Sequence, residues 1–398
     1  MPNSTRSSSA CWRSCERNHA TSSASPTRFP RTGASEESEG LANSSNSMDA
    51  TNDPGELMTA ATDLHRDSLV IDSHNDTAVA LIRRGNVGIA GEDGADRHGR
   101  AGAVAYLRQY LSPRGQEPVQ FTLPRLRQGA VDAAFFAVDT TRAWGNHLVY
   151  AIDAIGYLKR EIESHADDML LARSVDDIAT AKAAGKVAVL LAVENTAALQ
   201  HSLYAIDALY ELGVRTMTLT HSARTEAADG CEVEGGGGLT GFGRDVVRRM
   251  NELGLLVDVS HLNERGFWDT LEHSTAPVVA SHSCCWALCD HRRNLTDEQL
   301  RALGDAGGVV GITFVPFFVD TSAPSLDRLV EHFEHALEVA GGTSVGLGSD
   351  FDGGGDLLAH GGELPRITEA LLARGLAEDV VRGILGANHL RLLRQTIG

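Results

Sequence analysis

The segment Val70-Ile71-Asp72-Ser73-His74-Asn75-Asp76 places a short apolar run shortly before a histidine and a second aspartate. Four other apolar runs lead into a glutamate, a histidine or an aspartate in the same way. The polar residues at the ends of the five runs include His74, Glu194, His261, His282 and Asp350. In a parallel barrel the carboxyl ends of the strands meet at one face, where barrel enzymes carry their chemistry. The pattern therefore predicts a metal site at one end of a barrel.

Apolar runs rich in β-branched residues alternate with helix-like segments from about residue 56 onward, which is typical of strands buried on both faces. The expected strands are residues 68–72, 131–138, 187–193, 214–220, 255–260, 277–281, 308–314 and 345–349. The expected helices are residues 148–164, 202–212, 241–253, 264–273, 296–306 and 326–340. This alternation predicts an α/β fold, a TIM-like (β/α)8 barrel. We also expect two extra C-terminal helices over residues 371–397 and a long insertion after the first strand, over residues 84–127, of a length typical of functional lids.

Residues 1–55 differ in composition from the rest of the chain, being rich in Ser, Thr, Asn and Arg and poor in large apolar side chains. Such a segment cannot bury a core, so we expect a disordered extension, or a start-site artefact if Met48 is the true start. Residues 56–398 are the expected metal-dependent hydrolase domain. The extension lacks the apolar region of a secretory signal and the chain lacks a long apolar run, so we expect a cytoplasmic protein without a membrane partner.

The composition also argues against two further classes of protein, nucleic-acid-binding proteins and proteins held by a disulfide framework. The chain has 398 residues and a formal net charge of −18, and such an acidic protein repels phosphate backbones, which argues against a nucleic-acid partner. Six cysteines are too few for a disulfide framework in a chain of this length. No second Cys or His pair at zinc-cluster spacing accompanies Cys284, Cys285 and Cys289, so we expect ordinary packing cysteines.

The polar residues at the strand ends are sufficient for two cations. His74 and Asp76 are two apart, so on extended backbone they point to the same side, and an imidazole with a carboxylate suits Zn²⁺. Glu194 ends an apolar run, where a carboxylate is costly to bury unless it is paired or bound to metal. His74, Asp76 and Glu194 could hold one cation, and Glu194, His261 and His282 the other, with Glu194 as the bridge.

A carbamylated lysine, which bridges two metals in some barrel hydrolases, is not expected here. The chain has three lysines, and none lies at the carboxyl end of an expected strand. They are Lys159, Lys182 and Lys186. Water between two cations acts as hydroxide, and Asp350 at the barrel mouth can move its proton to the departing amine. Asp352 is the alternative for that role, although its position before Gly353 is typical of a turn.

Six segments, in order over about residues 65–395, resemble the membrane (renal) dipeptidase family, the zinc dipeptidases of the amidohydrolase superfamily. The segments are Ile71–Asp76, Leu219–Ser222, Gly238–Gly243, Val257–His261, Ser281–Ser283 with the downstream Arg292-Arg293-Asn294, and Gly348–Gly353. The resemblance implies hydrolysis of dipeptides at a binuclear zinc site bridged by Glu194, including dipeptides with a C-terminal D-residue. The family also suggests a homodimer.

The resemblance also implies roles for individual residues. It implies that the zinc ligands are His74, Asp76, Glu194, His261 and His282. His221 would contact the scissile carbonyl and stabilise its oxyanion. Arg293 would bind the free carboxylate of the substrate through its planar fork, and Asp350 would transfer the proton.

Two segments depart from the family pattern, and both bear on substrate preference rather than on metal binding. Asn195-Thr196 follow Glu194 where the family commonly has two glycines, and Thr77-Ala78-Val79 follow Asp76 where it often has Leu-Pro and an aromatic residue. The alternatives to a dipeptidase are another amidohydrolase activity, such as a lactonase or a deaminase, and a barrel that binds an acidic ligand without catalysis. Arg293 discriminates between the first alternative and a dipeptidase, because a substrate without a carboxylate does not need it.

Overall fold

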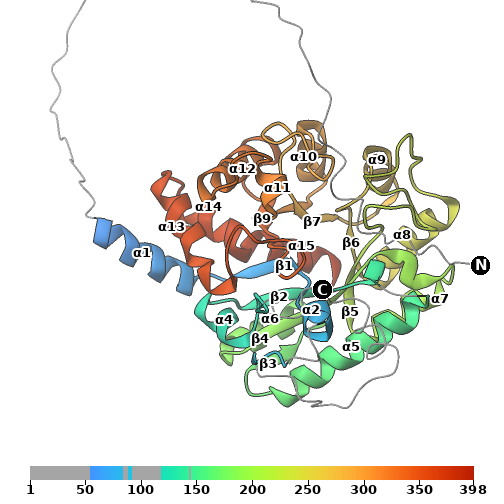
Figure 1. The fold of residues 1–398 in the computed structure, drawn as a ribbon, viewed down its shortest axis with the longest axis horizontal. Helices are drawn as coiled ribbons and strands as arrows, with labels where there is room; N and C mark the ends of the chain where they lie inside the picture. Colours follow the sequence, from blue (N-terminus) through green and yellow to red (C-terminus); the bar gives the residue numbers. More distant parts are fainter. Residues whose placement is uncertain (1–53, 84–87, 92–117, 143–144) are drawn as a thin grey trace, which may run out of the picture. The chain divides into compact units, whose positions relative to one another are not determined.

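The computed structural model describes residues 54–83, 88–91, 118–142 and 145–398. Nearly all of the expected N-terminal extension and most of the expected insertion over residues 84–127 lie outside these ranges. Within the described residues, strands stand at the centre and helices lie around them (Figure 1).

Nine strands form one parallel sheet in the described part of the chain. They are β1 (Ile71–Asn75), β2 (Ala133–Asp139), β3 (Met169–Leu171), β4 (Val187–Glu194), β5 (Val214–Thr218), β6 (Leu256–Asp258), β7 (Val279–Ser283), β8 (Val309–Ile312) and β9 (Val345–Leu347). The sheet closes because β2 pairs with both β1 and β4, so eight strands make a barrel and the predicted fold is confirmed. The sequence analysis missed β3, which pairs only with β4 outside the ring and is too short for a periodic pattern.

Alternate residues of the barrel strands belong to two separate cores. In β4, Val189 and Leu191 pack in the larger core, whereas Leu190 packs in the smaller one. The smaller core collects residues from six of the barrel strands together with α6 (Val175–Ala183) and α15 (Asn388–Thr396), so it is the interior of the barrel. Continuous burial on both faces explains why β2 and β4 are apolar at every position except the last.

The helices of the described residues follow the predicted pattern where the amphipathic period is clear. The expected helices over residues 241–253, 264–273 and 326–340 are α8 (Gly241–Leu253), α9 (Glu264–His273) and α12 (Leu326–Ala340). The others are α1 (Pro54–Asp67), α2 (Thr77–Arg83), α4 (Leu123–Gln128), α5 (His147–Ser164), α7 (Tyr204–Leu212), α10 (Asp297–Asp305), α11 (Pro316–Val319), α13 (Pro365–Ala373) and α14 (Glu378–Arg382). Among the described helices, α1, α2, α4, α6 and α11 were not predicted. The C-terminal helices begin at Pro365 rather than at residue 371, and they are three (α13, α14 and α15) instead of the two expected.

The ends of two helices near the barrel mouth are set by local chemistry. Thr240 caps α8 by accepting a hydrogen bond from the Gly243 amide, and Thr296 with Gln299 forms a capping box at the start of α10. Gly254 ends α8 at a φ of +72°, a left-handed conformation that glycine adopts without strain. These caps fix where the loops after β5 and β7 re-enter the helical layer.

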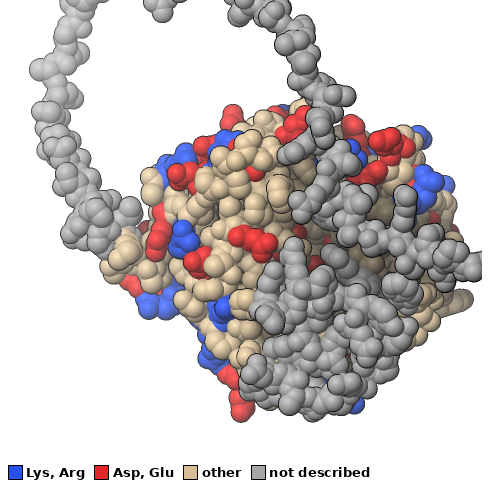
Figure 2. All heavy atoms as spheres, in the orientation of Figure 1, with Lys and Arg blue, Asp and Glu red and all other residues tan. Residues whose placement is uncertain are grey.

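The described helices include none that combines the length and the apolar character required to cross a bilayer. Acidic and basic side chains are interspersed on the face shown in Figure 2.

Candidate metal centre

The structure brings all five predicted metal ligands together at the carboxyl end of the barrel. Glu194 is the last residue of β4, and Asp76 and His261 follow β1 and β6. His74 and His282 lie within β1 and β7, not after them as the expected strand boundaries implied, because both strands extend about two residues further. All five side chains are buried.

The two carboxylate oxygens of Glu194 face different imidazoles. Oε1 lies 3.0 Å from Nε2 of His261 and 3.7 Å from Nε2 of His282, whereas Oε2 lies 3.9 Å from Nε2 of His74. Potential ligand atoms of His74, Asp76 and Glu194 lie within 4.8 Å of one another, and so do those of Glu194, His261 and His282. The arrangement matches the two predicted groups of three, with Glu194 common to both.

A buried aspartate that the sequence analysis did not single out orients His282. Oδ2 of Asp258 accepts a hydrogen bond from the Ser281 hydroxyl at 2.6 Å, and the same hydroxyl lies 2.8 Å from Nδ1 of His282. Because the hydroxyl donates its one proton to Asp258, it accepts from the N–H at Nδ1. The lone pair of His282 is therefore on Nε2, which faces the Glu194 carboxylate. Asp258 also accepts from the hydroxyl of Thr218 at 2.7 Å.

A second buried aspartate holds the segment that carries Asp350. Oδ1 of Asp72 accepts from the Ser349 amide at 2.7 Å, and its Oδ2 accepts from the Ser349 hydroxyl at 3.0 Å. Burial raises the pKa of Asp72 to about 7, against the opposing effect of these hydrogen bonds. Each of the two aspartates thus binds the serine directly before a residue of the site, Ser281 before His282 and Ser349 before Asp350.

The electrostatics of the five-residue cluster favour a bound cation. Burial raises the pKa of Glu194 well above its usual range, and the nearby charges of Asp76, Asp139 and Asp350 raise it further. Burial also lowers the pKa of His74 to about 4 and lowers the pKa values of His261 and His282 well below the usual range. Neutral imidazoles with crowded carboxylates are the donor set of a divalent metal site.

A buried nitrogen of His74 also indicates that the cluster fits a bound cation. Nε2 of His74 is buried and makes no hydrogen bond to any described residue, although it points at the Glu194 carboxylate. An orphaned imidazole nitrogen is costly in an apolar interior. A cation between His74, Asp76 and Glu194 would give that nitrogen a partner, so the residues present fit a metal.

Three residues of the site region have backbone conformations that side chains other than glycine rarely adopt. The φ angles are +90° at Asn195, +70° at His261 and +59° at Asp350. Such strain persists where surrounding contacts over-determine it, and it concentrates at functional sites. Asn195 is also one of the two residues that depart from the family pattern after Glu194. The glycine that the family commonly carries there would adopt this positive φ without strain, whereas Asn195 adopts it with strain.

Asp350 and Asp76 converge on Gly353. A methyl group at Gly353 would overlap Oδ1 of Asp350 and Oδ2 of Asp76, so the absence of a side chain there lets both carboxylates occupy their positions. Burial raises the pKa of Asp350 well above its usual range, and the charge of Asp76 raises it further. Asp350 therefore lies at the edge of the ligand cluster.

Asp352, the alternative to Asp350, is engaged elsewhere. Its Oδ2 accepts from the Thr77 hydroxyl at 2.8 Å, and its Oδ1 accepts from the Gln120 amide at 2.9 Å. The backbone amide of Asp352 in turn donates to the Gln120 side chain at 2.6 Å. These contacts tie the loop after β9 to α2 and to the segment before α4. They also give Thr77, a departure from the family pattern, a structural role.

His221 and Arg293 lie beside the ligand cluster. The rings of His221 and His261 are 4.2 Å apart between centroids, and His221 forms a further possible ligand group with Asp139 and Glu194. Arg293 is buried, and its Nη2 donates to the His282 carbonyl at 2.9 Å. His261 and Arg293 also share the lining of a pocket of about 200 Å³.

Two residues of the cluster were missed from the sequence. Asp139 is the last residue of β2 and obeys the same rule as Glu194, since it ends the apolar run over residues 133–138. That rule, applied to every strand, would have found it. Asp258 lies inside an apolar run, and its partners come from the neighbouring strands, so only the sheet register reveals it.

The three lysines make contacts away from Glu194. Nζ of Lys159 donates to the Leu212 carbonyl, that of Lys182 to Asp132 and Ser68, and that of Lys186 to the Ala166 carbonyl. All three lysine side chains are therefore engaged away from the five-residue cluster.

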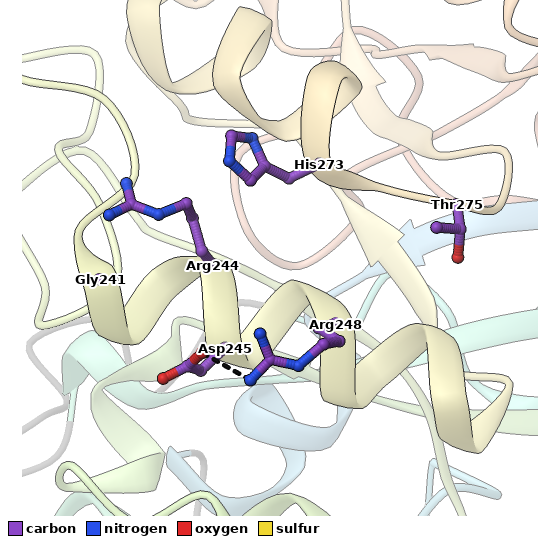
Figure 3. A pocket seen from close by; sticks show the side chains of 6 residues that line it. All are labelled: Gly241, Arg244, Asp245, Arg248, His273 and Thr275. Carbon is purple, nitrogen blue, oxygen red and sulfur yellow. Dashed lines mark hydrogen bonds and ion pairs between the residues drawn. The ribbon is translucent and has the colours of Figure 1, made fainter.

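A hollow of about 510 Å³ lies elsewhere, between α8 and α9 (Figure 3). Its lining includes Arg244, Asp245, Arg248 and His273, which are at least partly exposed, and Arg248 pairs with Asp245 at 2.6 Å. None of the predicted site residues lines it. Size alone would point to this hollow, whereas the convergence of buried ligands points to the barrel mouth.

Comparison with known proteins agrees with the geometry. A family model described as membrane dipeptidase (peptidase family M19) matches residues 58–397. Dipeptidase tcpJ of Claviceps purpurea (strain 20.1) is 33% identical over 290 residues, which cover 69% of this chain and 68% of the relative.

Two solved structures share the fold. A metallo peptidase from Rhodobacter sphaeroides, liganded with a phosphinate mimic of the dipeptide L-Ala-D-Ala, matches with a TM-score of 0.71 and 26% identity. The match covers 83% of this chain and 100% of that one. Dipeptidase AC, a metallo peptidase of family M19, matches with a TM-score of 0.71 and 27% identity, over 83% of this chain and 99% of that one.

Proposed function

The chain belongs to the membrane dipeptidase family, peptidase family M19, and from this membership and the site geometry we propose that it is a binuclear zinc dipeptidase. The family acts on dipeptides and its members are metallo-enzymes, so the proposal concerns the number and kind of metals and the residues that serve them. The proposed ligands are His74, Asp76 and Glu194 for one zinc, and Glu194, His261 and His282 for the other.

The observation that supports a dipeptide as the substrate is that Arg293 is buried without a counter-ion among the described residues. Arg293 is buried, with an exposed fraction of 5% for the whole residue. Its Nε has no hydrogen-bond partner, and no carboxylate lies within ion-pair distance of it among the described residues. A buried charge without a counter-ion is strongly destabilising. A substrate with a free carboxylate beside its scissile bond would supply the missing partner, and a dipeptide has one.

The residues around the metals have distinct proposed tasks. Two bound zinc ions would supply Lewis acidity and an activated water. Arg293 holds the terminal carboxylate and so orients the peptide bond over the ligand cluster. His221 donates a hydrogen bond to the carbonyl oxygen as negative charge develops on it. Asp350, beside Asp76, carries the proton to the departing amine.

We extend the proposal to dipeptides whose C-terminal residue has the D configuration. The support is the Rhodobacter sphaeroides relative, which is liganded with a mimic of L-Ala-D-Ala. L,L and L,D dipeptides have the same two termini and the same terminal carboxylate for Arg293. They differ only in the direction of the C-terminal side chain at its Cα. Turnover of matched L,L and L,D substrates would measure the preference directly.

The test of the function is a panel of L,L and L,D dipeptides assayed on protein whose metal content is measured in the same sample. We expect two zinc ions per chain and cleavage of dipeptides, with N-blocked amino acid amides inert because they lack the carboxylate. Metal-loaded protein that cleaves no dipeptide would refute the assignment.

Arg293 variants separate a dipeptidase from a lactonase or a deaminase. Arg293→Ala should raise KM for dipeptides about a hundredfold or more, because a charge-assisted bidentate contact is lost. Arg293→Lys keeps the charge without the planar fork and should restore only part of the binding. An enzyme whose natural substrate lacks a carboxylate would tolerate both changes.

A further inference from the structure

We propose that the 200 Å³ pocket beside Arg293 selects dipeptides whose C-terminal residue carries a second carboxylate, that is, C-terminal aspartate or glutamate. The inference rests on the proposed function, because it places the substrate's terminal carboxylate at Arg293. It adds a side-chain specificity and names Arg292 as the residue that confers it.

The pocket is continuous with the site and small enough to hold one side chain. Its lining runs from His261 in the ligand cluster to Trp286 and Arg292 at its rim. Its volume is about 200 Å³. A substrate whose terminal carboxylate lies at Arg293 would direct its C-terminal side chain into this space.

Buried polar atoms in the pocket lack partners, as expected for a site built to receive a polar ligand. Nε of Arg293 and Oγ of Ser283 are both buried and make no hydrogen bond to a described residue. Both residues line the pocket. Unsatisfied buried donors are rare in folded proteins, and each one calls for a partner. Two such donors in one pocket favour an acceptor-rich ligand such as a carboxylate.

The charge of the rim favours an acidic side chain. Arg292 is exposed and, among the described residues, makes no hydrogen bond and no ion pair. With Arg293 it gives the lining two guanidinium groups against one carboxylate, that of Glu264. The whole chain carries a net charge of −18, so the positive charge of the pocket lining is opposite in sign to that of the chain as a whole. Two adjacent guanidiniums match a ligand with two carboxylates.

Glu264 and Trp286 refine the expectation. Glu264 lies on the rim without an ion pair among the described residues, so it would weaken the binding of an acidic side chain. The side chain of Trp286 is 44% exposed and offers an apolar face to the methylene groups of the ligand. Removal of Arg292 and removal of Glu264 are therefore expected to shift the preference in opposite directions.

The experiment compares near-isosteric substrates that differ only in charge. The ratio of kcat/KM for Ala-Glu to that for Ala-Gln, and for Ala-Asp to Ala-Asn, is measured on zinc-loaded protein at low and high salt. We expect the acidic member to be preferred about threefold to fivefold at low salt, the range of a partly exposed charge pair. Added salt should reduce the ratio, because screening weakens such a pair.

Three variants with matched changes of charge complete the design. Arg292→Gln should bring the ratio close to one, and Glu264→Gln should raise it further. Arg394→Gln is the control, since Arg394 is an exposed residue of α15 outside the pocket lining and its replacement changes the net charge by the same amount. Thermal unfolding of each variant checks that the fold is retained.

The outcomes separate the two proposals. Cleavage of all four dipeptides with no preference for acidic residues would overturn the pocket assignment and leave the dipeptidase assignment standing. An equal shift in the Arg292→Gln and Arg394→Gln ratios would also overturn it, because the effect would then come from net charge. Failure of metal-loaded protein to cleave any dipeptide would overturn both.

Discussion

At the scale of the residue, Asp350 combines a strained backbone with a buried carboxylate. Its φ is +59°, and its carboxylate lies with that of Asp76 beside Gly353. Asp72 accepts a hydrogen bond from the amide of the preceding residue, Ser349. Because Asp350 lies beside the ligand cluster yet outside the two groups of three ligands, we propose that it moves protons rather than holds metal.

Asp350→Asn tests that role. The amide retains the size and the hydrogen-bonding shape of the side chain but cannot accept and release a proton, so kcat should fall by about 10² to 10⁴ while two zinc ions stay bound. Metal analysis and kcat are measured on the same preparation. Loss of metal together with activity would make Asp350 a ligand instead.

Asp258 offers a different test at the same scale, because it acts through Ser281 on His282. Asp258→Asn should weaken zinc affinity about tenfold to a hundredfold, as changes to the partners of metal-bound histidines do. The measurement is competition with a chelator of known affinity. Thr218→Val is the matched control, since it removes one hydrogen bond to Asp258 but leaves the path to His282 intact. Equal losses in both variants would indicate a purely structural effect.

At the scale of the element, α15 closes the barrel interior with a buried histidine. Nε2 of His389 lies 3.0 Å from the Leu347 carbonyl of β9, and its ring fills the space beside Gly346. Burial lowers the pKa of His389 to about 4, although the hydrogen bond to Leu347 opposes the shift. Near neutral pH the helix therefore packs against the sheet with a neutral imidazole.

This packing predicts a pH dependence of stability. The folded pKa is about 4 and lies below the value in the unfolded chain of about 6.5. The stabilising contribution is therefore complete above about pH 6.5 and is lost as the pH falls toward 4. Between pH 7 and pH 5 the free energy of unfolding should fall by about 2 kcal/mol from this residue alone.

The measurement is chemical denaturation of the wild type and of His389→Gln at both pH values. Glutamine retains a donor for the Leu347 carbonyl but does not titrate. The variant should show a smaller loss between pH 7 and pH 5 than the wild type. Parallel losses in the two proteins would exclude His389 as the cause.

At the scale of the whole molecule, the metal centre joins strands that are far apart in the sequence. Its proposed ligands lie within the last two residues of β1, β4 and β7, or up to three residues beyond β1 and β6. Without a cation, the crowded carboxylates of Asp76, Glu194 and Asp350 oppose one another. Bound metal should therefore stabilise the fold as well as serve catalysis, because it binds the folded chain and not the unfolded one.

Chelation should lower the Tm by several degrees, and added Zn²⁺ should restore it, since a ligand at a hundred times its Kd contributes about 2.7 kcal/mol. Differential scanning calorimetry with metal quantification checks this. Mg²⁺ serves as the control, because a site with three imidazoles prefers zinc. An unchanged Tm in protein shown to be metal-free would contradict the expectation.

The local pattern of the sequence was sufficient to predict the barrel and the five buried residues that cluster at its carboxyl end. His74, Glu194 and His282 could be recognised because buried strands are apolar until a functional residue interrupts them, and the three lysines could be excluded by their positions. The strand ends were predicted about two residues early at β1 and β7. Their last residues are polar but buried, and hydrophobicity does not mark them as strand.

Only the tertiary structure decided which strands close the barrel and which buried side chains contact one another. The pairing of β2 with β4 closes the ring, and β3, although it lies between them in the chain, stays outside. Asp258 reaches Ser281 and Thr218 because three strands stand side by side, and Arg293 meets its pocket through a loop ten residues beyond β7. The sequence by itself determined which polar side chains lie near the carboxyl ends of the strands, since burial and polarity are local properties. Which of them touch is set by hydrogen-bond register between distant segments, and no local pattern encodes it.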